Sequence, residues 1–190
     1  DFLVNPVDLD KAGVLLKQAG FASVEKNDHE CHIAYHRRRN NIRSIWEMHW
    51  SPNGIPKGEV GELTREYLSD IIEAAVPCTI QGSECLVPTP FHHGLIMLLH
   101  TAGHFINTGI GLRHLCDWAV FANKFSDEEF KELFEEKLQA IGMWRFAQIL
   151  TQLSVVYLGM PPKQWSNIEI GTEYLEAVMS DIFKGGNFRV

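Results

Sequence analysis

The chain has 190 residues, 45% of them hydrophobic and 22% charged, a composition typical of a globular protein with a sizeable core. Its formal net charge of −7 argues against non-specific nucleic-acid binding, which requires clustered positive charge. The apolar runs are too short to span a bilayer, so we expect no membrane partner. The four cysteines form no CxxC pair, which argues against a disulfide framework or zinc knuckle and favours the cytoplasm.

The first half of the chain shows short segments of strand type. Residues 2–4 are an apolar run, after which Asn5 as N-cap and Pro6 at the first helical position predict a helix that ends at Gly20. Short alternating segments then predict an antiparallel meander, with strands at residues 22–26, 31–36 and 42–50. Its one basic cluster is interpreted as a solvated turn, with an anion contact as the alternative. This cluster contains Arg37, Arg38, Arg39 and Arg43.

The chain changes from short alternating runs to long helical ones near residue 88. Before that point, residues 60–75 have the apolar spacing of an amphipathic helix lying against the sheet or beside it, and residues 78–87 predict a small hairpin. Beyond it we expect only helices. We therefore predict an α+β fold in which a small mixed β-sheet with flanking helices (residues 1–88) precedes an all-helical domain (residues 89–190) packed against it.

Two helices broken at residues 107–111 form the centre of the helical half. Thr89 can cap the first helix, and Pro90 can occupy its first position. At offsets of seven and four residues, three histidines of this helix fall on one face: His93, His100 and His104. On the second helix Arg113 and Asp117 are four residues apart and can pair. Later helices are expected at residues 126–141, 143–158 and 169–183.

Two acidic residues are placed where strands would hold them. Asp1 begins the first strand, and Glu47 lies between Trp46 and Met48, so its side chain should point to the face opposite theirs. A carboxylate in such a strand usually has a partner, and two of them on adjacent strands suit a hard cation such as Mg²⁺. We expect these carboxylates within about 8 Å of each other. His49 should point to the same side as Glu47.

Several motifs carry a resemblance to a known family: DFLVNP with Gly20-Phe21 after the first helix, WEMHW, HHGLIMLLHTAGHF and GIGLRHLCDWAVF. The chain resembles, over nearly its whole length, the uncharacterised bacterial nucleotidyltransferases of the polymerase-beta-like superfamily. In that superfamily a Gly-Ser turn precedes an Asp-x-Asp pair, and a third acid stands on a neighbouring strand. The resemblance implies that Asp1 is the second acid of the pair and Glu47 the third. The turn and the first acid are expected before residue 1, which would make this chain a fragment of a longer protein.

The resemblance implies a metal-dependent nucleotidyltransferase that uses Mg²⁺ or Mn²⁺. Such an enzyme transfers a nucleoside monophosphate from a nucleoside triphosphate to an acceptor, here an unknown small molecule or protein. Asp1 and Glu47 would be its catalytic residues and metal ligands. The helical half would complete the cleft, with Arg113 meeting a phosphate or carboxylate and Asp117 holding it in place. The further candidates for substrate binding are His49, His100 and His104.

Alternatives remain open for the histidines and for the function. His100 and His104 could ligate Zn²⁺ with a third ligand from His93 or Asp117, could be satisfied structural side chains, or could contact substrate. The protein could instead be a non-catalytic binding or antitoxin-like module with a degenerate nucleotidyltransferase fold. A third alternative is a helical metal-dependent phosphohydrolase, against which the chain contains no His-Asp dipeptide.

Overall fold

The computed structural model describes residues 1–24 and 31–185. The predicted turn at residues 27–29 and the end of the predicted strand at 22–26 lie outside the described residues. The chain forms two compact units, one of Asp1–Asn53 with Asp70–Val87 and one of Gly54–Ser69 with Pro88–Val190. The first unit, here called the sheet unit, holds the four-stranded sheet and a hairpin, and the second, the helical unit, is built from helices. The predicted α+β class is confirmed.

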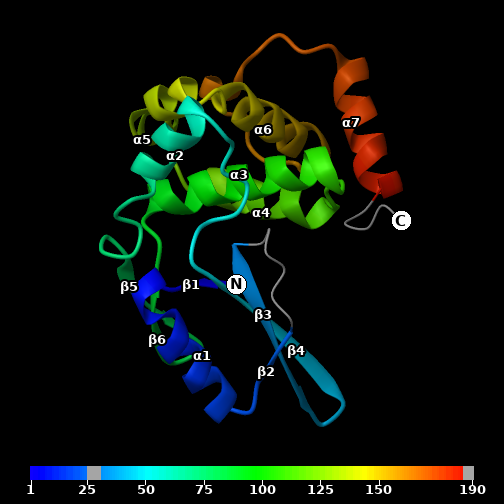
Figure 1. Ribbon diagram of the computed structural model, residues 1–190. Helices are drawn as coiled ribbons and strands as arrows, with labels where there is room; N and C mark the ends of the chain where they lie inside the picture. Colours follow the sequence, from blue (N-terminus) through cyan, green and yellow to red (C-terminus); the bar gives the residue numbers. More distant parts are fainter. Residues whose placement is uncertain (25–30, 186–190) are drawn as a thin grey trace. The chain divides into compact units, whose positions relative to one another are not determined.

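The main sheet of the sheet unit has the strand order β1-β4-β3-β2 and is mixed (Figure 1). β1 (Phe2–Leu3) runs parallel to β4 (Ile42–His49), with Phe2 opposite Met48. β3 (His32–Arg39) is antiparallel to β4, and β2 (Ala22–Ser23) is antiparallel to β3. The first strand of the chain therefore lies directly beside the strand that carries Glu47.

One face of this sheet is covered by the first helical segment. Asn5 accepts a hydrogen bond from the backbone of Val7 and caps a short 3₁₀ turn (Pro6–Asp8), which leads into α1 (Leu9–Gln18). A small core then forms from Leu16 of α1, Phe21, Tyr35 and Met48. Because Met48 faces this core, the alternation along β4 turns Glu47 and His49 to the opposite face.

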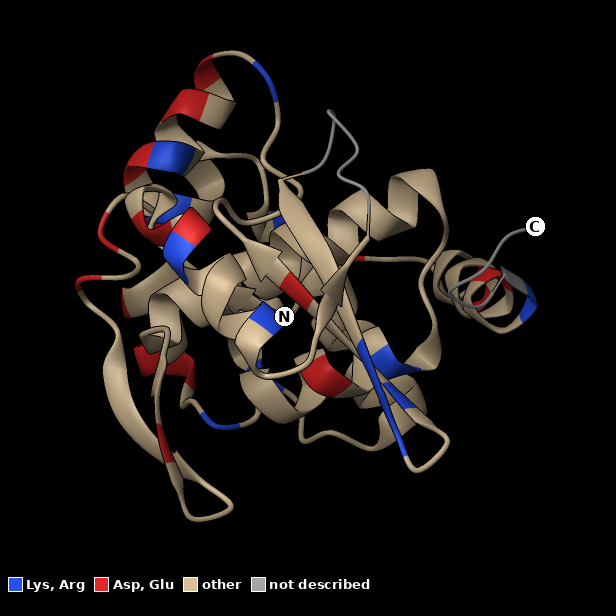
Figure 2. Ribbon diagram, turned by 60° about the horizontal axis from the view of Figure 1, so that its bottom comes forward, with Lys and Arg blue, Asp and Glu red and all other residues tan. Residues whose placement is uncertain are grey.

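The turn between β3 and β4 consists of Asn40 and Asn41, both with positive φ (50° and 63°). Such a pair matches the twist of a two-residue hairpin, and asparagine tolerates this left-handed conformation better than most residues. The predicted basic cluster flanks this turn from both strands instead of forming it, with Arg38 opposite Arg43 (Figure 2). Arg37 donates a hydrogen bond to the backbone oxygen of Ala19 (2.9 Å).

The helix expected at residues 60–75 is shorter, and it belongs to the helical unit. α2 spans Glu59–Tyr67, and the backbone oxygen of Tyr67 lies 3.1 Å from Nε2 of His92, which belongs to the same unit. The remainder of the predicted helix forms turns, and the boundary between the two units falls after Ser69. The predicted hairpin is present as β5 (Val76–Ile80) and β6 (Ser83–Val87), a separate two-stranded sheet.

The remaining helices follow the order expected from the sequence: α3 (Pro90–Asn107), α4 (Leu112–Ala122), α5 (Asp127–Ala140), α6 (Trp144–Leu158), a 3₁₀ turn (Gln164–Ser166) and α7 (Thr172–Gly185). Thr89 caps α3, and Ser126 with Glu129 forms a full capping box on α5. α4 packs against α6, where the indole of Trp118 donates a buried hydrogen bond to Thr151 (2.9 Å). No helix within the described ranges is long and apolar enough to cross a membrane.

Candidate metal centre

Two neighbouring strands bring together the acidic residues singled out from the sequence. Phe2 lies opposite Met48, so Asp1, the residue directly before β1, lies beside Glu47 on β4. The carboxylates and His49 each offer one ligand atom, and these atoms all lie within 4.8 Å of one another. Nε2 of His49 is 3.5 Å from Oε2 of Glu47 and 3.9 Å from Oδ2 of Asp1. The expectation that the two carboxylates lie within about 8 Å of each other is thus confirmed.

Burial differs sharply within this group of three. The side chains of Asp1 and Glu47 are 59% and 38% exposed, whereas that of His49 is only 10% exposed. Both carboxylates are therefore accessible to a solute, while the imidazole lies beneath them in the sheet.

The surroundings of His49 favour its neutral form. Burial lowers the pKa of its imidazole, the nearby His32 lowers it further, and the charge of Glu47 opposes both effects. A neutral imidazole keeps a lone pair for a metal ion. Because its Nε2 is buried and makes no hydrogen bond of good geometry, a cation held between this nitrogen and the carboxylates would give it a partner.

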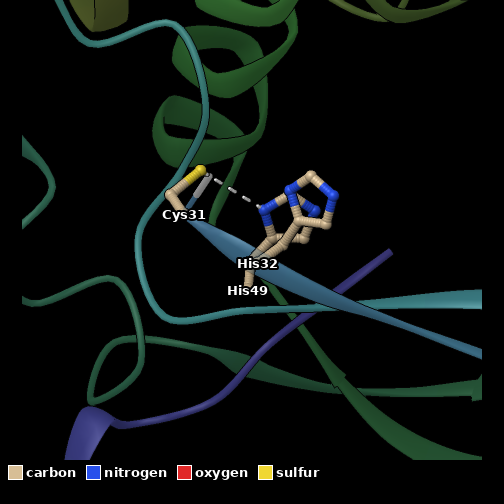
Figure 3. A group of neighbouring side chains, drawn as sticks. All are labelled: Cys31, His32 and His49. Atoms are coloured by element: carbon tan, nitrogen blue, oxygen red, sulfur yellow. Dashed lines mark hydrogen bonds between the residues drawn. The ribbon is translucent and has the colours of Figure 1, made fainter. Parts of the chain in front are cut away.

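The other nitrogen of His49 faces a different set of side chains. Nδ1 lies 3.8 Å from Sγ of Cys31, and the ring centres of His32 and His49 are 4.8 Å apart (Figure 3). Cys31, His32 and His49 form a second group whose ligand atoms lie within 4.8 Å of one another. His49 is thus shared between an oxygen-rich group and a sulfur- and nitrogen-containing one.

The residues present fit a divalent cation. Two carboxylate oxygens and one neutral nitrogen leave several positions of an octahedron for water and substrate oxygens, as Mg²⁺ and Mn²⁺ sites usually do. A purely oxygen-lined site would suit Mg²⁺ best, and the imidazole shifts the preference towards Mn²⁺. Sequence reasoning placed His49 beside Glu47 but did not name it as a ligand.

The helical histidines assemble differently from the grouping favoured by the sequence. His100 and His104 of α3 are joined by His114 of α4, and the ligand atoms of the three lie within 4.8 Å of one another. His93 instead places its ring 5.2 Å from that of Phe121. The residue that the structure groups with His100 and His104 is thus His114, and not His93 or Asp117, because spacing along one helix cannot show which side chain the next helix contributes.

Arg113 and Asp117 form the ion pair that their spacing predicts, but a loose one. Nε of Arg113 lies 3.8 Å from Oδ2 of Asp117, too far for the expected hydrogen bond, and the side chains are 87% and 61% exposed. The pair is therefore exposed to solvent and not buried between helices. The guanidinium has most of its donors available to a ligand.

A small mixed sheet with paired carboxylates on adjacent strands, followed by helices, is consistent with a nucleotidyltransferase. A family model described as uncharacterised nucleotidyltransferase matches residues 1–159, and the chain belongs to this family. The match includes Asp1, Glu47 and His49 as well as the helices from α3 to α6. No curated protein and no solved structure matches the chain.

Proposed function

We propose that this protein is a metal-dependent nucleotidyltransferase that transfers a nucleoside monophosphate from a nucleoside triphosphate to an acceptor. The observation that carries the proposal is the convergence of Asp1, Glu47 and the buried His49, whose ligand atoms lie within 4.8 Å of one another. Family membership supports nucleotidyl transfer as the reaction class. The acceptor, a small molecule or a protein, is left open.

Asp1 and Glu47 are the proposed catalytic residues and metal ligands. A divalent cation held there, Mg²⁺ or Mn²⁺, would activate the attacking hydroxyl and neutralise charge on the leaving pyrophosphate. The two carboxylates supply negative charge at a position that solvent and phosphates can reach. His49 beneath them contributes a neutral donor, so it adds a ligand without adding charge that would repel a triphosphate.

Arg113 is the proposed phosphate contact of the helical unit. Its guanidinium is 87% exposed and only loosely paired with Asp117, so two parallel donors can turn to a phosphate while the carboxylate limits their movement. His49 is a proposed metal ligand together with the carboxylates of Asp1 and Glu47. His100 and His104 belong to a separate cluster, which makes direct substrate contact by them a weaker proposal than for Arg113.

Pyrophosphate release tests the proposed function. The full-length protein would be incubated with Mg²⁺ or Mn²⁺, labelled nucleoside triphosphates and candidate acceptors, including the protein itself. Glu47→Gln keeps the size of the side chain and should lower turnover at least about 100-fold, since several kcal/mol of charge stabilisation are lost. Glu84→Gln, an exposed strand carboxylate of the same unit outside the group, is the matched control and should leave turnover unchanged.

Two results would count against the proposal. Equal pyrophosphate release by the wild type and Glu47→Gln would remove the carboxylate pair from the reaction. Nucleotide binding without turnover for any acceptor, in protein that binds Mn²⁺, would instead support the non-catalytic binding module.

A further inference from the structure

A cluster of three imidazoles, here called the histidine cluster, lies where α3 meets α4. His100 and His104 are one turn apart on α3, and His114 comes from the first turn of α4. Their ring centres are 4.5 Å apart for His100 and His104, 5.3 Å for His104 and His114, and 5.9 Å for His100 and His114. All three side chains are half-buried. The cluster shares no residue with the group around Glu47.

These separations suit a common metal ion. With Zn–N bonds of about 2.0–2.1 Å, imidazoles arranged tetrahedrally around one ion have ring centres roughly 5 Å apart. The three observed separations lie on both sides of that value. Small side-chain rotations, without movement of either helix, would therefore close the rings on an ion.

The surroundings of His114 lower the pKa of its imidazole. Burial lowers the pKa of His114, His104 lowers it further, and the backbone carbonyl of Gly111 opposes these effects in part. A neutral imidazole provides a lone pair for a cation. Nδ1 of His114 is also buried without a hydrogen bond of good geometry.

Metal-binding histidines usually form a hydrogen bond through the ring nitrogen that does not bind the metal, and Thr108 can provide this partner for His104. Nδ1 of His104 lies 2.9 Å from Oγ1 of Thr108, whose hydroxyl can in turn donate to the backbone oxygen of His104 (3.5 Å). When Nδ1 donates to this hydroxyl, Nε2 keeps its lone pair for a metal ion. The threonine lies in the turn that joins the two helices.

We propose that His100, His104 and His114 bind a transition-metal ion of the Zn²⁺ class, with a fourth position open to water or an anionic group. Three nitrogen ligands select Zn²⁺, Co²⁺ or Ni²⁺ over Mg²⁺, which prefers oxygen. This site is therefore distinct in chemistry from the carboxylate centre. Because its ligands come from both helices, the ion links α3 to α4 across the turn at residues 108–111.

Cobalt is the probe for this site, because Co²⁺ in a four-coordinate nitrogen site absorbs visible light strongly and replaces Zn²⁺. The full-length protein would be titrated with Co²⁺ and, by calorimetry, with Zn²⁺. We expect one equivalent to bind with a four-coordinate spectrum. His104→Gln and His114→Gln should each weaken binding at least about 100-fold, because losing a ligand costs more than losing an outer partner. His93→Gln, on the same helix but outside the cluster, should bind like the wild type.

Two further variants make the test decisive. Thr108→Val keeps all three ligands and should weaken Co²⁺ binding about 10-fold, an effect that a purely structural role of the histidines would not produce. His49→Gln should leave the spectrum unchanged. If His49→Gln abolishes it while His104→Gln and His114→Gln retain it, the ion belongs to the sheet unit and the proposal is overturned. Absence of Co²⁺ and Zn²⁺ binding by folded wild-type protein, checked by circular dichroism, would also overturn it.

Discussion

His49 shows how one residue can serve two environments. Its Nε2 faces the carboxylates of Asp1 and Glu47, while its Nδ1 faces the sulfur of Cys31. The proton of a neutral imidazole can sit on only one of these nitrogens, so the group that binds a metal ion sets the tautomer seen by the other. A cation held by the carboxylates would therefore leave the proton on Nδ1, next to the sulfur.

His93 has a lowered pKa without belonging to any ligand group. Partial desolvation of a side chain that stays exposed to solvent is the main cause, and Lys124 adds to it. Below about pH 6.5, the ordinary pKa, the unfolded chain takes up a proton here that the folded protein binds less readily. The free energy of unfolding should therefore fall as the pH drops below that value, until the pKa of the folded state is reached.

His93→Gln should flatten this pH dependence, which urea denaturation between pH 5 and about pH 8 would measure. Lys124→Gln is the matched variant. Because burial outweighs the lysine charge, this variant should keep most of the wild-type slope. A slope that is unchanged in His93→Gln would show that His93 carries a normal pKa.

At the scale of elements, α3 combines close packing along one side with the histidine cluster near its C-terminal end. A Cβ atom at Gly94 would lie 2.7 Å from two ring atoms of Phe134 and 2.8 Å from one of Phe121, closer than side chains tolerate. Gly103 on the same helix meets only Cα of Gly54, at an ordinary 3.7 Å. Close packing thus excludes a larger side chain at Gly94, whereas the space at Gly103 admits one.

Alanine substitution should change the stability of the protein differently at Gly94 and Gly103. Gly94→Ala should destabilise the protein by about 1–3 kcal/mol, because the aromatic rings must move. Gly103→Ala should be neutral or stabilising by up to about 1 kcal/mol, since alanine loses less backbone entropy in a helix. Urea denaturation of both variants checks this. Equal effects on stability would mean that the rings around Gly94 adapt without cost.

Within each element, the sequence was informative because local rules decide local structure. The caps at Asn5, Thr89 and Ser126 and the break after α3 follow from hydrogen bonding and turn chemistry, and all are present. The alternation along β4 was sufficient to place Glu47 and His49 on the same face. These features depend on neighbours within a few residues, which a single sequence displays.

At the scale of the whole molecule, the sequence was less informative because distant segments decide the outcome. The assignment of α2 to the helical unit depends on contacts such as that between Tyr67 and His92, 25 residues apart. His114 joins His100 and His104 only because the chain turns back at residues 108–111. Likewise, Cys31 could not be connected with His49 from spacing, since pairing of β3 with β4 brings them together.

The two proposed metal sites provide a test of how the molecule is organised. The carboxylate group lies in the sheet unit and the histidine cluster in the helical unit, and they have no residue in common. A metal ion that binds only the folded state stabilises it by an amount set by its affinity and concentration. If the sites act independently, the stabilisation by Mn²⁺ should be unaffected by His114→Gln, and that by Zn²⁺ unaffected by Glu47→Gln.

The stabilisation by each ion can be measured by thermal denaturation. The proteins compared are the wild type, both single variants and the double variant, each with and without the two ions. We expect the effects of the two substitutions to add within about 0.5 kcal/mol, as is usual for substitutions without shared partners. Glu84→Gln should change neither response. A larger deviation would mean that binding in one unit alters the other, and the histidine cluster would then act as a regulator of the carboxylate centre instead of an independent link between α3 and α4.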